Sequence, residues 1–245
     1  DRVDCRHVLF RRGFVMIEPF WRRPFYAVVC CTLIIALTFG VRQTFGLFMV
    51  PISEGLGWGR EAFSIAIATQ NLMIGLSAPF FGAAADKWGA VKVVTGATAL
   101  YAMATYLISH STTPDTMLAS AGFMAGFALG GCGLPLLLSI VGRVAPEQRR
   151  TAWLGIVTAG ATMGQLIMVP ATQQLIAGYG WVNAVFILSV LTATAIPLAM
   201  SLSAVGTGAA DRRAPHSLTA ALKEARGPSG FILLVLGFFV CGLQV

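Results

Sequence analysis

Charged side chains are scarce in this sequence. Only 11% of the 245 residues are Asp, Glu, Lys or Arg, whereas 56% are hydrophobic and the mean hydropathy is +0.77. A soluble domain carries about 25% charged residues, so this chain cannot cover its surface with polar groups and its solvent must be lipid. A backbone in lipid has to form its hydrogen bonds internally. Because the apolar runs are long and do not alternate, we expect an all-α, polytopic membrane helical bundle.

Cysteine and histidine do not occur in metal-binding or catalytic patterns. The five cysteines show no Cys-x-x-Cys spacing, and we interpret them as small buried apolar residues. The three histidines fall outside the expected helices, and no Ser/His/Asp grouping occurs. Intramembrane catalysis needs polar groups that converge at depth. We therefore expect no enzyme activity, catalytic residue, metal site or cofactor.

Six long apolar runs predict six transmembrane helices within residues 25–202. They cover about 25–50, 62–81, 93–108, 116–141, 152–176 and 184–202. A basic arm (1–24) precedes them, and a polar linker (203–229) follows. The last apolar run, 230–245, is shorter than the roughly 20 residues that span a bilayer, so we interpret it as a truncated seventh helix. The chain begins with Asp1, so we expect a fragment, with Met16 as a candidate start.

The basic residues predict the orientation. Fifteen of the 17 Lys and Arg lie in the N-terminal arm and in the second, fourth and sixth loops. The first, third and fifth loops hold only Arg60, and Arg42 lies inside the first helix. Basic loops favour the cytoplasmic side, so we expect the N-terminus and the 203–229 linker to be cytoplasmic. This topology signal accounts for the net charge of +7, and no nucleic-acid partner is expected.

One charged stretch, residues 82–92, interrupts the apolar sequence between the second and third helices. It contains Gly82, Asp86, Lys87 and Gly89, and Lys92 supplies a trailing base. This spacing resembles the loop between helices two and three of the major facilitator superfamily. The sequence departs from the family pattern directly after the second glycine, where two apolar residues stand in place of bases.

The resemblance covers about residues 24–245, which are similar to the first half of a major facilitator transporter. Residues 42–46, 57–60 and 149–155 are similar to bacterial members near the monocarboxylate and oxalate/formate branch. The resemblance implies a secondary active transporter of a small, monocarboxylate-like organic anion in the bacterial cytoplasmic (inner) membrane. It would work by alternating access, together with the missing C-terminal half of the same transporter. The alternative is a membrane sensor or scaffold that keeps the fold without transporting.

Arg42 is the candidate anion-binding charge, because it is the only full charge inside the six predicted spans. An arginine at that depth is costly unless it faces a wet cavity or a partner. A carboxylate substrate matches its guanidinium fork, whereas the simpler interpretation is a side chain that extends to the lipid headgroups. Thr38 and Phe45 share its helix face at four and three residues' spacing. Weaker candidates, which could instead tie helices together, are Gln70, Asn71 and Gln165.

The charged stretch has a different expected role, which the resemblance supplies. The corresponding aspartate of the family acts as a conformational latch, and Asp86 with its neighbours Gly82, Lys87 and Gly89 takes that position here. Arg143 is the candidate partner. The simpler interpretation of Asp86 is a solvated turn acid. Apart from Asp86, no Asp or Glu lies in helices one to six, so this part of the chain offers no group for proton coupling.

Overall fold

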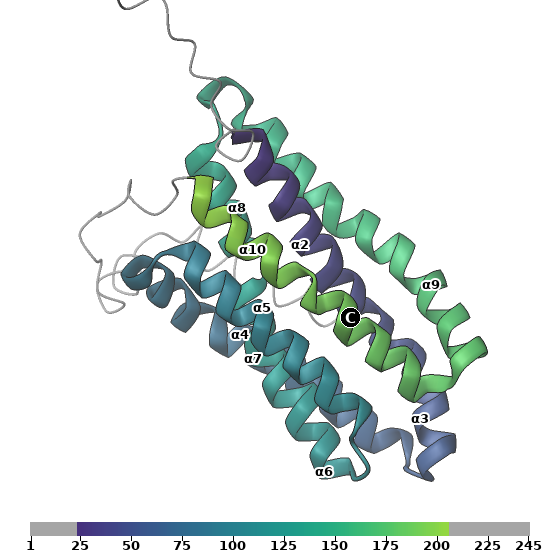
Figure 1. The fold of residues 1–245 in the computed structure, drawn as a ribbon. Coiled ribbons are helices and arrows are strands. Elements are labelled where there is room, and N and C mark those ends of the chain that lie inside the picture. The colour runs from purple at the N-terminus through teal and green to yellow at the C-terminus, as the bar shows by residue number, and fades with distance from the viewer. Residues whose placement is uncertain (1–23, 206–245) are drawn as a thin grey trace, which may run out of the picture.

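The structure is a computed structural model that describes residues 24–205 (Figure 1). The predicted basic arm, most of the polar linker and the predicted seventh helix lie outside the described residues. Within them every regular element is helical, which confirms the all-α bundle. Five helical stretches are long and apolar enough to cross a membrane: Phe25–Leu56, Arg60–Trp88, Ala90–Ser109, Pro114–Val144 and Glu147–Ser201.

The first three of these stretches are nearly continuous helices. The first consists of α2 (Pro24–Thr44), the 3₁₀ segment η2 (Phe45–Phe48) and α3 (Met49–Leu56). It therefore continues past Pro51, where the sequence predicted its end. The second and third are α4 (Arg60–Trp88) and α5 (Ala90–Ser109).

The fourth stretch changes helix type twice along its length, from α to π and back to α. It consists of α6 (Pro114–Met117), the π-helix η3 (Leu118–Met124), α7 (Ala125–Cys132) and α8 (Leu134–Val144). A 3₁₀ turn, η4 (Glu147–Arg149), connects it to the fifth stretch.

The fifth stretch contains both of the last two predicted helices. It comprises α9 (Arg150–Ala193) and α10 (Ala195–Ser201), followed by η5 (Leu202–Val205). Gly180 breaks the helical backbone inside α9 with φ 78° and ψ 165°, a region that favours glycine. Figure 1 shows that the ribbon reverses direction between the label of α9 and that of α10. By length and composition α9 belongs to a single apolar stretch. The division of the chain into six separate transmembrane helices therefore stays a prediction.

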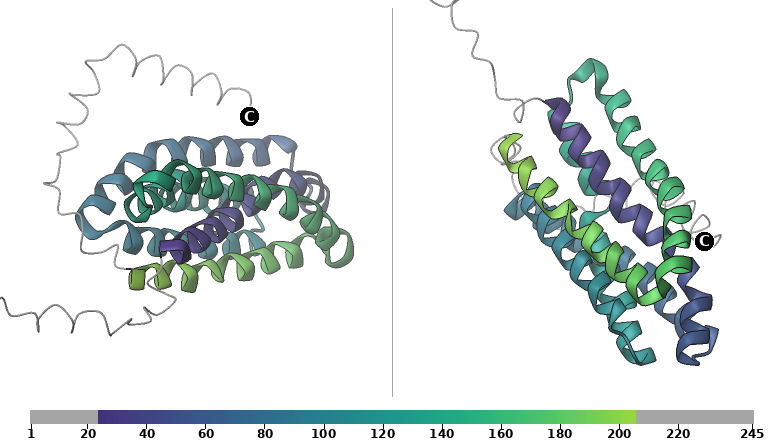
Figure 2. Two further views of the ribbon diagram at one scale, coloured as in Figure 1. Left: turned by 90° about the horizontal axis from the view of Figure 1, so that it is seen from above. Right: turned by 45° about the vertical axis from the view of Figure 1, so that its right-hand side comes forward.

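Glycine-lined contacts bring the helices together. α2 packs chiefly against α9, while α4 packs against η3 and α7; both views in Figure 2 show α2 beside α9. An added Cβ at Gly126 would lie 2.6 Å from the carbonyl oxygen of Gln70, so only glycine permits that approach. Large apolar side chains such as Leu72, Phe80 and Leu166 are exposed, as expected of helices that face lipid. Cys30, Cys31 and Cys132 are buried.

The charged stretch between the second and third helices is itself helical. We expected a loop over residues 82–92, but α4 continues through Trp88 and α5 begins at Ala90. Gly89 alone separates them, with φ 93°. The expectation of a loop was wrong because small and charged residues continue a helix readily. Only a residue with the freedom of glycine makes the turn.

Candidate functional site

Arg42 lies in the last turn of α2 and reaches across to α4. Its Nη2 donates a hydrogen bond of 2.6 Å to Oδ1 of Asn71. Its Nε is buried and makes no hydrogen bond within residues 24–205. No carboxylate in that range lies within ion-pair distance of the guanidinium. The cation is therefore held by one neutral amide and keeps the capacity to donate to an anion.

A small cavity of about 190 Å³ lies beside this pair. Its polar side chains are Arg42 and Asn71. The walls are apolar and come from α2, α4, α7 and α8; they include Phe39, Ile74, Leu129, Leu134 and Pro135. Drug-sized ligands occupy about 300–1,000 Å³, so this volume suits a smaller molecule with one polar end.

The fourth membrane stretch is interrupted at the same cavity. Gly133 is extended, with φ −74° and ψ 174°, and α8 begins at Leu134. Pro135 sits in the first turn of α8, where its missing N–H costs nothing. Gly133, Leu134 and Pro135 all line the cavity. The N-terminal end of α8, which carries partial positive charge, therefore lies at the same cavity as the guanidinium.

The sequence only partly indicated this break. A proline at position 135, inside the helix expected over residues 116–141, is compatible with a kink, but it is equally compatible with the first turn of a new helix. The signal that identifies the break is the Gly-Leu-Pro sequence from Gly133. It places a residue without Cβ directly before a proline-containing first turn.

The other predicted binding residues do not line this cavity. Thr38 is fully buried, and its hydroxyl donates to the carbonyl oxygen of Ile34 at 2.9 Å. Phe45 packs in the apolar core. Gln70 is buried, and its Nε2 donates to the carbonyl oxygen of Ala121 at 3.0 Å, which ties α4 to η3. Gln165 is half-buried on α9. The structure thus brings Arg42 and Asn71 together, and a binding role for the other four stays a prediction.

Asp86 and Arg143, two of the predicted latch residues, lie close together at the C-terminal end of α4. Oδ1 of Asp86 lies 3.9 Å from Nη2 of Arg143 on α8, with the two side chains 64% and 37% exposed. Lys87 Nζ lies 5.7 Å from the ring centre of Trp88. Gly89 supplies the turn, and an added Cβ at Gly82 would meet nothing within 4 Å. Asp86 occupies the last turn of α4, where the helix dipole disfavours an anion. Arg143 offsets that cost.

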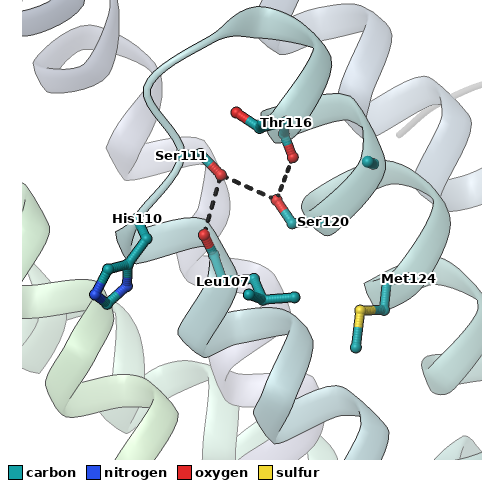
Figure 3. Close-up of a pocket in the computed structure, with 7 residues that line it drawn as sticks. Leu107, His110, Ser111, Thr116, Ser120 and Met124 are labelled. Atoms are coloured by element: carbon teal, nitrogen blue, oxygen red, sulfur yellow. Dashed lines mark hydrogen bonds between the residues drawn. The ribbon is translucent and has the colours of Figure 1, made fainter.

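A second cavity, of about 290 Å³, lies between the end of α5 and the start of the fourth stretch (Figure 3). Its hydroxyl groups bond to one another and to the backbone. Oγ of Ser111 lies 3.1 Å from Oγ of Ser120, which donates to the carbonyl oxygen of Thr116 at 2.7 Å. Because these polar groups are already satisfied, they offer little to an anion. The Arg42 cavity is the candidate site.

Residues 29–244 match the sequence model of the Major Facilitator Superfamily. The chain is 27% identical over 140 residues to "Probable anion transporter 2, chloroplastic" of Oryza sativa subsp. japonica, an alignment that covers 57% of this chain and 26% of that protein.

Two further relatives carry more specific names. The chain is 24% identical over 172 residues to "4-hydroxybenzoate transporter PcaK" of Pseudomonas putida, which covers 69% of this chain and 38% of that protein. It is 28% identical over 191 residues to "Monocarboxylate transporter 13" of Rattus norvegicus, an alignment that covers 75% of this chain and 40% of that protein. The chain thus spans between 26% and 40% of the length of these three relatives.

Proposed function

The chain belongs to the major facilitator superfamily, and on that premise we propose that it forms part of a secondary active transporter for a small organic anion. The chain is an integral membrane protein. The family and the names of the relatives point to transport rather than catalysis. The proposed mechanism is alternating access: this bundle and a second bundle of the same transporter enclose the anion and open to one side of the membrane at a time.

One observation carries the proposal. Arg42 lines an apolar cavity, bound to the neutral amide of Asn71 and without a carboxylate within ion-pair distance in residues 24–205. An intramembrane arginine needs a partner or water, and a carboxylate satisfies it with two parallel hydrogen bonds. The N-terminal end of α8 adds partial positive charge at the same cavity. An anion is therefore the ligand that best fits the electrostatics of this cavity.

The cavity walls support a monocarboxylate in particular. Apart from Arg42 and Asn71, the side chains that line the cavity are aliphatic or aromatic. A second carboxylate would have to be buried against these walls without a counter-charge, which is costly. The substrate we propose therefore has one carboxylate and a compact apolar body.

Uptake by proteoliposomes that contain the intact protein tests this function. We expect accumulation or exchange of radiolabelled 4-hydroxybenzoate, benzoate or lactate, and competition by other monocarboxylates but not by the neutral analogue benzamide. Equal transport of benzamide would contradict an anion site. Specific binding of the acids without any movement across the bilayer would support the sensor or scaffold instead.

We also propose that the N-terminus is cytoplasmic and that the protein resides in a bacterial inner membrane. The asymmetry of basic loop residues supports this orientation.

Thr112 is exposed in the connection between α5 and α6, whereas its neighbour Ser111 is buried. In intact cells we expect a membrane-impermeant maleimide to label Thr112→Cys fully. Gln148→Cys, exposed in η4, is the control and should react only after permeabilisation, with Cys5 and Cys241 replaced by serine throughout. The reverse pattern would overturn the orientation.

Asp86 and Arg143 are proposed to act as a latch for the conformational cycle, separate from the substrate site. Their pair at 3.9 Å is largely exposed, so it contributes only about 0–1 kcal/mol to stability. We expect Asp86→Asn to lower the transport rate several-fold while the dissociation constant for 4-hydroxybenzoate changes less than about twofold. Arg143→Gln should have the same effect, and the double variant should be no slower than either single one. Equal loss of binding and rate would contradict a latch.

A further inference from the structure

Asn71, which holds Arg42, uses only part of its own hydrogen-bonding capacity. A guanidinium carries donors only, so the oxygen of the Asn71 amide has to face it. Oδ1 of Asn71 accepts from Nη2 of Arg42 at 2.6 Å, and this is the only hydrogen bond that the Asn71 side chain makes within residues 24–205. Its Nδ2 amino group therefore keeps both donors in that part of the chain, and Asn71 lines the Arg42 cavity.

The adjacent amide, Gln70, shows how a side chain that ties helices together behaves in this bundle. Gln70 is 2% exposed, and its Nε2 donates to the backbone carbonyl oxygen of Ala121 at 3.0 Å. Asn71 is exposed instead, and its one hydrogen bond goes to a cation that lines a cavity. The position of Asn71 therefore points to a role in the cavity.

The lack of charge on Asn71 is the second observation. The same helix, α4, offers a carboxylate to another arginine, because Asp86 lies 3.9 Å from Arg143. An aspartate at position 71 would have nearly the same shape as asparagine and could accept the same hydrogen bond from Arg42, but it would cancel the positive charge. The amide holds the guanidinium and leaves that charge to a ligand.

We propose that Asn71 sets the charge selectivity of the Arg42 cavity, an inference that rests on the proposed function. Its Oδ1 keeps the guanidinium at the cavity wall, and its neutrality keeps the cavity positive. The incoming carboxylate takes hydrogen bonds from the terminal N–H groups of Arg42 that Asn71 does not occupy, and from Nδ2 of Asn71. An acid at position 71 would occupy the guanidinium in place of the substrate and would repel the carboxylate.

Asn71→Asp and Asn71→Leu together test this inference in the intact protein, with radiolabelled 4-hydroxybenzoate as the probe. Leucine removes the amide without adding charge, so we expect the affinity to fall about tenfold, as for the loss of one hydrogen bond to a charged group. Aspartate should lower the affinity about a hundredfold or more, because a like charge then faces the carboxylate. A merely structural role predicts the reverse order, since aspartate keeps the contact with Arg42 and leucine loses it.

Asn183→Asp is the matched control, because Asn183 is the only other asparagine in the sequence. It is exposed on α9, where its Nδ2 donates to the carbonyl oxygen of Tyr179 at 2.9 Å, and it does not line the cavity. This control should leave the affinity unchanged. The melting temperature of ligand-free Asn71→Asp should equal or exceed that of the wild type, because an ion pair replaces a neutral hydrogen bond to Arg42.

Two outcomes overturn the inference. One is binding by Asn71→Asp that is as tight as binding by Asn71→Leu, or tighter. The other is a fall in both affinity and melting temperature in Asn71→Asp, because the acid would then damage the fold instead of occupying Arg42. If Arg42→Gln binds 4-hydroxybenzoate normally, the proposed function itself fails. If Arg42→Gln loses binding and Asn71→Asp keeps it, only the role of Asn71 is contradicted.

Discussion

Replacement of Arg42 by glutamine should abolish binding of organic anions. The substitution keeps a hydrogen-bonding side chain beside Asn71 but removes the only cation that lines the cavity within residues 24–205. A bound carboxylate would then be buried against apolar walls with no counter-charge, and loss of one partner from such a pair costs about 2–5 kcal/mol. That cost corresponds to a loss of affinity of about 30-fold to several thousand-fold, at 1.4 kcal/mol for each factor of ten.

Arg42→Lys is the more informative variant of the two. Lysine keeps the charge but offers a single compact ammonium group in place of a planar fork. It cannot donate two parallel hydrogen bonds to a carboxylate while a third nitrogen is held elsewhere. We expect an affinity between those of the wild type and Arg42→Gln. Binding by Arg42→Lys that equals the wild type would show that charge alone is recognised.

Equilibrium binding of radiolabelled 4-hydroxybenzoate to the purified, intact protein measures both effects. Arg60→Gln is the control, since Arg60 is exposed at the start of α4 and its loss leaves the cavity unchanged. Wild-type affinity in Arg42→Gln would contradict the proposed anion site. Arg42 would then be interpreted as an anchor near the membrane surface.

The fold was predictable because lipid leaves few options for a chain this apolar. The scarcity of charged residues and the long unalternating apolar runs indicated helices, and residues 24–205 confirm them. Helix ends were less predictable. Pro51 was expected to end the first helix, but the backbone continues through the 3₁₀ segment η2 into α3. A helix inside a bundle can absorb a proline where neighbouring groups compensate for the lost hydrogen bond.

The candidate site was predictable in its charge but not in its surroundings. Arg42 was identified because an arginine inside an apolar run is rare. Gln70 and Asn71 are adjacent, and consecutive helical residues point about 100° apart. Only packing decides that Asn71 meets Arg42 while Gln70 bonds to Ala121. Thr38 was expected on the face of Arg42, but its hydroxyl is used by its own helix. Phe45 begins the 3₁₀ segment, so the spacing of a regular α-helix does not hold beyond it.

The second large effect concerns the contact between α2 and α9. Gly164→Ala should strongly destabilise the bundle, because the added Cβ would overlap the backbone carbonyl group of Ala36. Backbone atoms cannot rotate away as a side chain can, so the two helices would have to separate. The same contact holds Gly40 against Met168, with an added Cβ 2.6 Å from its Cγ. Separation would therefore loosen α2 along the length that carries Arg42. Overpacking costs about 1–3 kcal/mol and occasionally more, and we expect the upper part of that range.

Thermal unfolding of the purified protein in detergent measures this effect, with Gly155→Ala as the control. Gly155 lies on the same helix, but an added Cβ there would meet nothing within 4 Å. Alanine is favoured over glycine inside a helix by about 0.5–1 kcal/mol, so the control should melt at the same temperature or slightly higher. The two variants make the same chemical change on one helix and differ in what the added methyl group meets. If Gly164→Ala and Gly155→Ala have the same melting temperature, the close approach of α2 and α9 is not a determinant of stability. If Gly164→Ala alone melts early and also binds 4-hydroxybenzoate weakly, the α2–α9 contact supports the position of Arg42.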